Sequence, residues 1–433
     1  MERHLLTELV DWKSSLRRKP AIINGARQVG KTWLLKEFGK RYFDNVAYVN
    51  LDNNRAMDSL FEEGYDTARL LTGIQAETNE RIIAGKTLII FDEIQECPKA
   101  LTSLKYFSEN ASEQMIVAAG SLLGLSVHQG TGFPVGKVTT FNLYPLSFRE
   151  FLDATSNQML RELIDSSDLP SITAFSSKFI PLLRQYYFTG GMPEAVKAFT
   201  ESGVLEDARL IQKQILSDYR RDISKHLSTT ETEYILAAWT SVPKHLGQEN
   251  KKFIFGNIKD GARGRNYHAA LTWLTEAGLA HKVRRVSKPG IPLAAHADDS
   301  AFKLFTLDVG LLGAMADLDS GSVISGNQVF EEFKGALTEQ YVCQQLISDC
   351  KLQPFYWSAE NSRGEIDFLI QDRGQIYPIE VKAEENLRSK SLRAFSEKHQ
   401  NTHPRRFSLS GFRNEGWMHN IPLYAAGNRD IWQ

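Results

Sequence analysis

The chain has 433 residues, more than a single hydrophobic core usually covers, so we expect roughly two to four domains. A net charge of −1 excludes an overall basic character, and any contact with nucleic acid must therefore come from a local patch. Three cysteines without a C-x-x-C pair argue against a zinc site or a disulfide framework. No apolar run reaches the ~20 residues that cross a bilayer, so we expect a cytoplasmic protein without membrane contact.

Residues 25–32 form the first motif along the chain and fit the phosphate-loop pattern G-x-x-x-x-G-K-[ST]. The motif follows the apolar run 21–23 and precedes the helix-like segment 33–38, which is the strand–loop–helix context that the pattern requires. The glycines let backbone N–H groups turn toward phosphate oxygens, and the helix N-terminus adds a favourable dipole. We expect the whole loop to bind ATP: Gly25, Ala26, Arg27, Gln28, Val29, Gly30, Lys31 and Thr32. Lys31 supplies a charge for the β- and γ-phosphates, and the Thr32 hydroxyl a ligand for Mg²⁺.

The segments 46–51, 87–92 and 115–119 read as further strands of the same domain. The second is almost continuously apolar, as is typical of a parallel sheet that is covered on both faces. Strands that alternate with helices predict an α/β fold with a doubly wound parallel sheet, whose ligands lie at the strand C-termini.

Polar side chains stand at two of these strand ends. Asp92 is predicted to hold Mg²⁺, directly or through water, and Glu93 to act as the general base for the attacking water, with Lys31 as a third catalytic residue. Ser121 follows the strand 115–119 and would touch the γ-phosphate or the water; a serine that only satisfies a turn is the alternative. The segment 144–151 then begins a helix near Ser147 with a capping box.

These motifs together resemble the prokaryotic AAA+-type ATPases. The resemblance rests on the segments 25–32, 91–95, 119–121, 144–151 and 190–194 and covers nearly the whole chain. It implies a C-terminal domain of unknown function of the PD-(D/E)xK nuclease-like type, and a homo-oligomer in which a neighbour contributes an arginine. Many relatives have Gly-Arg where this chain has Gly136 and Lys137, which argues against an arginine finger there. Arg220 and Arg221 are the other candidates, and a salt-bridge role on a helix surface is the alternative for both.

The resemblance and the pattern changes along the chain predict four domains: a P-loop ATPase domain (1–155), a helical lid (156–228), a winged-helix domain (229–320) and a nuclease-like domain (321–433). In the third, a helix 266–277, a strand 279–286, a turn 287–290 and a strand 301–307 follow the winged-helix order. Basic residues that suit DNA phosphates gather there: Lys251, Lys252, Lys259, Arg263, Arg265, His268, Lys282, Arg284, Arg285 and Lys288. A surface for protein contacts, or a merely solvated one, is the alternative.

The C-terminal segment predicts a hairpin whose strands are 365–370 and 377–382. A two-residue turn at Arg373-Gly374 would place Asp367 directly opposite Glu380, about 5 Å away. Lys382 would share the face of Glu380, and Glu339 on a helix 329–349 could complete the acidic cluster. Carboxylates this close repel one another and favour a divalent cation.

By its resemblance to the PD-(D/E)xK core, the hairpin would bind Mg²⁺ through Asp367, Glu380 and the Val381 carbonyl, with Lys382 in the catalytic set. The alternatives are a salt-bridge ladder or a nuclease fold used only for binding. The leading hypothesis is an ATP-hydrolysing enzyme coupled to a DNA-binding region with nuclease activity. Its rivals are a nucleotide-gated switch that binds partner proteins and a DNA-binding ATPase with an inactive nuclease.

Overall fold

The computed structural model describes residues 2–121, 133–225, 227–325, 331–359, 364–384 and 388–431. It divides into two compact units, Glu2–Tyr144 and a larger one that consists of Pro145–Thr275 and Leu279–Gln433. The smaller unit ends before residue 155, the predicted end of the ATPase domain. The predicted lid, winged-helix and C-terminal regions fall within the larger unit.

The smaller unit contains the predicted parallel sheet. Within its described residues, five strands lie in the order β2 (Asn45–Asn50), β3 (Thr87–Asp92), β4 (Met115–Ser121), β1 (Ala21–Gly25) and β5 (Thr139–Asn142), and all neighbours are parallel. Every residue of β3 and β4 is buried, which explains why these strands are apolar throughout instead of alternating. The three strands expected between residues 46 and 119 are confirmed.

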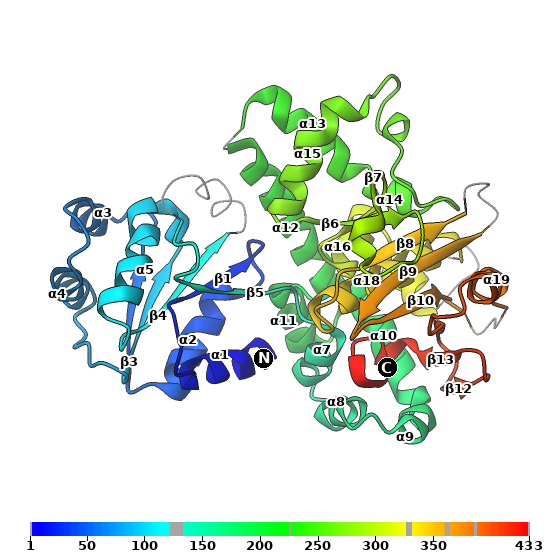
Figure 1. Ribbon diagram of the computed structural model, residues 1–433, viewed down its shortest axis with the longest axis horizontal. Coiled ribbons are helices and arrows are strands. Elements are labelled where there is room, and N and C mark those ends of the chain that lie inside the picture. The colour runs from blue at the N-terminus through cyan, green and yellow to red at the C-terminus, as the bar shows by residue number, and fades with distance from the viewer. Residues whose placement is uncertain are drawn as a thin grey trace. The chain divides into compact units, whose positions relative to one another are not determined.

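Helices cover both faces of this sheet (Figure 1). They are α1 (Leu5–Ser14), α2 (Lys31–Tyr42), α3 (Arg55–Glu62), α4 (Thr67–Thr78) and α5 (Pro98–Asn110). On one face, Ile89 and Phe91 of β3 share a buried core with Phe61 of α3 and Leu104 of α5. On the other face, Gly39 of α2 lies so close to β2 that a Cβ would overlap the Val46 side chain. The doubly wound α/β fold is therefore confirmed for this unit.

The larger unit is built on a mixed sheet. Its described residues place eight strands in the order β12 (Arg413–Asn414), β13 (His419–Pro422), β11 (Arg405–Ser408), β10 (Gln375–Val381), β9 (Glu365–Asp372), β8 (Phe355–Ser358), β6 (Ala280–Val286) and β7 (Ala297–Thr306). Strand β6 pairs in parallel with β8, so the predicted winged-helix strands and the C-terminal strands form one sheet across position 320. After Pro422 ends β13, residues Leu423–Ala425 form a 3₁₀ turn.

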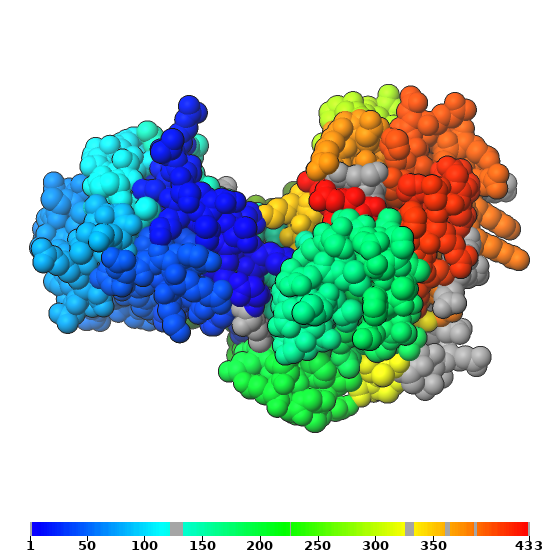
Figure 2. Space-filling model, turned by 90° about the horizontal axis from the view of Figure 1, so that it is seen from below, coloured from blue at the N-terminus to red at the C-terminus, as the bar shows by residue number. Residues whose placement is uncertain are grey.

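Helices surround this sheet (Figure 1). They are α7 (Phe148–Ala154), α8 (Gln158–Asp165), α9 (Leu169–Ala174), α10 (Ser176–Thr189), α11 (Pro193–Ser202), α12 (Leu205–Lys225), α13 (Thr229–Thr240), α14 (Val242–Leu246), α15 (Gly264–Glu276), α16 (Val309–Met315), α17 (Ser320–Ser325), α18 (Glu331–Ser348) and α19 (Lys390–Lys398). The helical segment of the predicted lid lies beside the C-terminal segment in this unit (Figure 2). The two segments are joined inside the unit, because the buried Phe179 stacks on the buried Tyr424 with ring centroids 4.6 Å apart. The division of this unit into three domains stays a prediction.

Two motifs of the family resemblance meet inside the larger unit. The Leu146 amide donates to the Gly191 carbonyl at 2.6 Å, and the Gly191 amide donates to Asp308 Oδ2, also at 2.6 Å. A Cβ at Gly190 would overlap the Asp308 carboxylate, which explains why a glycine stands there. Asp308 also caps α16 by accepting from the Leu311 amide at 3.0 Å. The segments 144–151 and 190–194 are thus architectural, because they join α7, α10 and α16 in one buried hydrogen-bonded junction.

Candidate nucleotide site and acidic cluster

The phosphate loop connects β1 to α2 at the carboxyl edge of the parallel sheet. Gln28 and Gly30 adopt positive φ angles of 64° and 93°, which turn the loop tightly before α2 begins at Lys31. Gly25 leaves no room for a side chain, because a Cβ there would lie 2.5 Å from the Leu143 carbonyl oxygen. Arg3, which the sequence did not single out, holds the loop from behind by donating to the Val29 carbonyl at 2.9 Å.

Lys31 lies inside the loop and is nearly fully buried. Its ammonium donates to the carbonyl oxygens of Gly25 at 3.0 Å and Ala26 at 2.8 Å. Burial lowers the pKa of Lys31 to about 8, although Glu93 and Asp92 act in the opposite direction. Lys31 is therefore a poorly solvated ammonium group whose hydrogen bonds within the described residues go to two neutral carbonyls. Contact with an anionic ligand would stabilise its charge.

The residues predicted to hold Mg²⁺ are brought together. Thr32 Oγ1 donates to Asp92 Oδ2 at 2.7 Å, and the Tyr48 hydroxyl donates to the same oxygen at 2.8 Å. Burial, followed by the hydrogen bond to Asp92, raises the pKa of Tyr48, so this phenol stays a donor. A hydroxyl and a carboxylate oxygen in contact form the oxygen-donor set that Mg²⁺ prefers, so the residues present fit this ion.

Glu93, the predicted general base, is positioned by a residue that received no role from the sequence. Gln95 Nε2 donates to Glu93 Oε2 at 2.5 Å, while Gln95 Oε1 accepts from the Ser121 amide at 3.2 Å. Glu93 itself has a left-handed backbone conformation, with φ 52° and ψ 44°. Non-glycine residues rarely adopt this conformation, and those that do are concentrated at functional sites. Gln95 thus connects the ends of β3 and β4, and all the predicted catalytic residues of this unit lie at one edge of the sheet.

In the larger unit, the predicted hairpin and its register are confirmed. Strand β9 runs antiparallel to β10, and Asp372 pairs with Gln375 on either side of Arg373-Gly374, whose φ angles of 46° and 75° suit a tight turn. The ladder continues to the pair Phe368 and Ile379, in the register that sets Asp367 against Glu380. Asp367 Oδ2 accepts from the Val381 amide at 2.7 Å.

Lysine side chains form ion pairs with the carboxylates of the hairpin and of Glu339. The buried Lys303 of β7 lies 2.5 Å from Glu365 Oε1 and 3.6 Å from Glu339 Oε2, and Lys251 donates to Glu339 Oε1. Lys382 pairs with Glu380 at 2.9 Å. Burial alone would lower the pKa of Lys303, but Glu339, Glu365 and Asp367 together raise it. Burial raises the pKa of Asp367 to about 7, and Glu339 adds to the rise.

The metal site predicted at Glu339, Asp367 and Glu380 stays a prediction. Among the described residues, no group of three or more His, Cys, Asp or Glu side chains is arranged to hold a metal ion. The ammonium groups of Lys251 and Lys303 both pair with Glu339, the acid that was expected to complete the cluster.

Part of the predicted basic surface is also neutralised within the unit. Arg284 pairs with Asp299 at 3.1 Å and Arg285 with Asp298 at 2.7 Å, and both aspartates come from the neighbouring strand β7.

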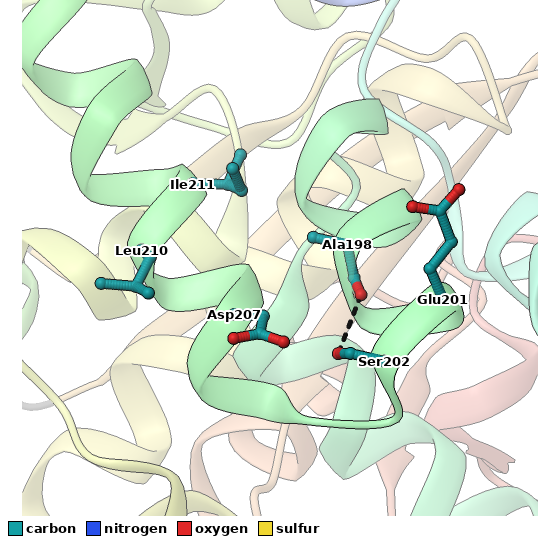
Figure 3. Close-up of a pocket in the computed structure, with 6 residues that line it drawn as sticks. All are labelled: Ala198, Glu201, Ser202, Asp207, Leu210 and Ile211. Carbon is teal, nitrogen blue, oxygen red and sulfur yellow. Dashed lines mark hydrogen bonds between the residues drawn. The ribbon is translucent and has the colours of Figure 1, made fainter.

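A shallow hollow between α11 and α12 is lined by Ala198, Glu201, Ser202, Asp207, Leu210 and Ile211 (Figure 3). Its two carboxylates would repel a phosphate group, so it is not a candidate for nucleotide binding.

Comparison with known proteins agrees with the geometry of the smaller unit. Residues 17–152 match the family described as "AAA domain", residues 180–322 match a domain of unknown function (DUF8612), and residues 334–417 match another (DUF4143). Together with the parallel sheet and the loop, the first match shows a P-loop ATPase domain of the AAA type. A comparison with the curated proteins found none that matches this chain.

Solved structures similar to this chain are distant from it. The Walker-type ATPase PABY2304 of Pyrococcus abyssi is 13% identical, with a TM-score of 0.45, over 73% of this chain and 95% of that one. The Aeropyrum pernix ORC1 protein in complex with DNA is 13% identical, with a TM-score of 0.28, over 73% of this chain and 91% of that one. Cdc6p from Pyrobaculum aerophilum is 12% identical, with a TM-score of 0.27, over 74% of this chain and 93% of that one. At these TM-scores the likenesses carry no argument about function. No helix among the described residues is long and apolar enough to cross a membrane.

Proposed function

We propose that the chain binds ATP with Mg²⁺ at residues 25–32 and hydrolyses it with the help of Asp92 and Glu93. The observation that carries this proposal is the 2.7 Å hydrogen bond between Thr32 and Asp92, because it joins the loop to the acidic end of β3 at the place where a phosphate-bound Mg²⁺ belongs. The family match of residues 17–152 supports it.

Each residue has a role that follows from its position. Lys31 would exchange its two carbonyl contacts for the β- and γ-phosphate oxygens, with the amides of the loop and of the α2 N-terminus around them. Thr32 and Asp92 would hold Mg²⁺, which when bound neutralises charge on the phosphate oxygens. Glu93 would accept the proton of the attacking water, in the orientation that Gln95 fixes, while Ser121 at the end of β4 would sense the γ-phosphate.

The test is ATP binding and turnover in substituted full-length chains. Lys31→Ala should weaken ATP binding at least about tenfold, whereas Glu93→Gln should bind ATP normally and lose roughly 100-fold in kcat. Lys40→Ala, an exposed lysine on the same helix, is the matched control and should leave both properties unchanged. Turnover by Glu93→Gln at the rate of the unsubstituted protein would refute the assignment of the base.

Gln95 gives a sharper check, because it acts only through Glu93. Gln95→Leu keeps the side-chain size but removes both hydrogen bonds, so kcat should fall about tenfold while KM for ATP changes little. A rise in KM with kcat intact would mean that Gln95 serves nucleotide binding and not the positioning of the base.

For the larger unit, two observations favour the switch without cleavage over the nuclease. Glu365 and Glu380 of the hairpin are paired with lysines, and the arginines of β6 are paired with aspartates. We propose that the larger unit binds a partner under control of the nucleotide site and cuts no phosphodiester. Incubation with single-stranded, duplex and branched DNA and with Mg²⁺ or Mn²⁺ tests this, and cleavage that Asp367→Ala abolishes would restore the nuclease.

DNA contact through residues 229–320 and a homo-oligomer remain part of the same proposal. Stimulation of ATP turnover by DNA would support the contact. Turnover per chain that rises with protein concentration would support completion of the nucleotide site by a neighbouring subunit.

A further inference from the structure

The Asp92 carboxylate accepts hydrogen bonds at both of its oxygens. Its Oδ2 accepts from the Thr32 hydroxyl at 2.7 Å and from the Tyr48 hydroxyl at 2.8 Å, and its Oδ1 accepts from the Glu93 amide at 3.1 Å. A carboxylate has about four lone-pair positions, shared equally between its oxygens. Oδ2 is therefore fully occupied, and only Oδ1 has a position left for a cation.

Tyr48 reaches Asp92 from the neighbouring strand. Strand β2 pairs in parallel with β3, and Tyr48 lies opposite Ile90, two residues before Asp92. Residues two apart on a strand share a face, so the side chains of Tyr48 and Asp92 stand on the same face of the sheet. Helix α2 covers this face, because its Gly39 lies against Val46 of β2. The phosphate-loop helix and Tyr48 thus approach Asp92 from the same side.

The ring of Tyr48 is held in place by α2. Lys36 lies one helical turn after Thr32, and its ammonium is 3.9 Å from the centroid of the Tyr48 ring. Residues four apart share a helix face, so Thr32 and Lys36 approach the strand ends together. A cation at this distance attracts the face of the ring. The phenol is therefore fixed with its hydroxyl toward Asp92, and the hydrogen bond to Oδ2 is a built part of the site.

This hydrogen bond limits the ways in which Asp92 binds a cation. Without the Tyr48 hydroxyl, each carboxylate oxygen would have an open position, and both oxygens could hold the same ion. Ca²⁺ accepts such bidentate carboxylates, whereas Mg²⁺ is smaller, gives up its waters reluctantly and binds few carboxylate oxygens. The Tyr48 hydroxyl therefore removes the binding mode that favours Ca²⁺ and leaves a mode that suits Mg²⁺.

We propose that Tyr48 is a positioning residue that makes the nucleotide site select Mg²⁺ over Ca²⁺, by occupying Oδ2 of Asp92. The inference rests on the ATP site proposed above and adds the residue that sets the cation specificity of that site. Tyr48 acts through Asp92 and needs no contact with the nucleotide or the cation.

The test measures how tightly the full-length chain binds adenylyl imidodiphosphate, a non-hydrolysable ATP analogue, by titration calorimetry in excess Mg²⁺ and in excess Ca²⁺. The unsubstituted chain should bind the analogue more tightly with Mg²⁺. Tyr48→Phe keeps the ring that Lys36 contacts and removes only the hydroxyl, so binding with Ca²⁺ should tighten about tenfold while binding with Mg²⁺ changes less than about threefold.

Tyr65→Phe is the matched control in the same unit. Tyr65 stacks on Tyr106, and its hydroxyl makes no hydrogen bond in the part of the chain that the structure describes. This substitution should leave both dissociation constants unchanged. Tyr48→Leu also lacks the donor, and it takes the place of Tyr48→Phe if the phenylalanine protein is not folded by circular dichroism.

A ratio of the two dissociation constants that is unchanged in Tyr48→Phe overturns the inference. Equal weakening with both cations also overturns it, because Tyr48 would then orient Asp92 without selecting the cation. Both results leave the proposed ATP site intact. An unsubstituted chain that binds no nucleotide with either cation would refute the site itself, and the role of Tyr48 with it.

Discussion

Nucleotide binding should depend on pH through Lys31. The free chain holds this lysine with a pKa of about 8, mainly because of burial, whereas phosphate oxygens in contact with it would raise the pKa again. Below pH 8 the free chain is ready to bind; above it, binding must also take up a proton. The arithmetic for a pKa of about 8 gives roughly an eightfold loss of ATP affinity between pH 7.5 and pH 9.0, or about 1.2 kcal/mol.

Titration calorimetry in two buffers of different ionisation enthalpy measures both quantities. At pH 9.0 the observed heat should differ between the buffers by an amount that corresponds to about 0.9 protons taken up per ATP, and at pH 7.5 by about 0.2. Lys31→Met should bind weakly and show neither the pH dependence nor the uptake, while Lys40→Ala should reproduce both. Equal affinities at the two pH values, with heats that do not depend on the buffer, would refute the reasoning.

Three further predictions concern stability, measured by chemical denaturation. Gly25→Ala forces a Cβ against the Leu143 carbonyl and should cost about 1–3 kcal/mol, with a lower denaturation midpoint than the unsubstituted chain. Lys303→Met leaves Glu339 and Glu365 without their buried partner and should cost about 3–5 kcal/mol, against less than ~1 kcal/mol for Lys213→Met, which breaks an exposed pair. The pKa of Asp367 is about 7 in the folded chain and 3.8 in an unperturbed aspartate, so between these values the folded state binds a proton that the unfolded state does not. The free energy of unfolding should therefore fall as the pH rises from about 4 to about 7. Asp367→Asn should remove the contribution of this residue to that fall.

Local patterns predicted the parts of the sites that are contiguous in sequence. The loop 25–32 carries its own glycines and lysine, and β3 ends directly in Asp92 and Glu93, so adjacency in the chain gives proximity in space. The hairpin register followed from the turn at Arg373-Gly374, because a two-residue turn fixes which residues face each other. The capping box of Ser147 and Glu150 was equally local and is confirmed.

Contacts between distant segments carried no such signal. Lys251 was grouped with the basic residues of a DNA-binding surface, yet it pairs with Glu339, 88 positions further along the chain. Nothing near Lys303 in the sequence marks it as a buried cation, because it stands in an ordinary apolar strand. Tyr48 and Gln95 were missed for the same reason, since their partners Asp92 and Ser121 come from other strands of the sheet.

The pairing of β6 with β8 has a practical consequence for anyone who dissects this molecule. A fragment that begins at position 321 would lack β6, the strand that pairs with Phe355, Tyr356 and Trp357 of β8 in the intact sheet. It would expose β8 as an unpaired edge strand, which favours self-association. It would also leave Lys251 and Lys303 behind, so Glu339 and Glu365 would lose the ammonium groups that pair with them in the intact chain. Activity found in such a fragment would therefore describe an artefact of the cut and not the parent protein.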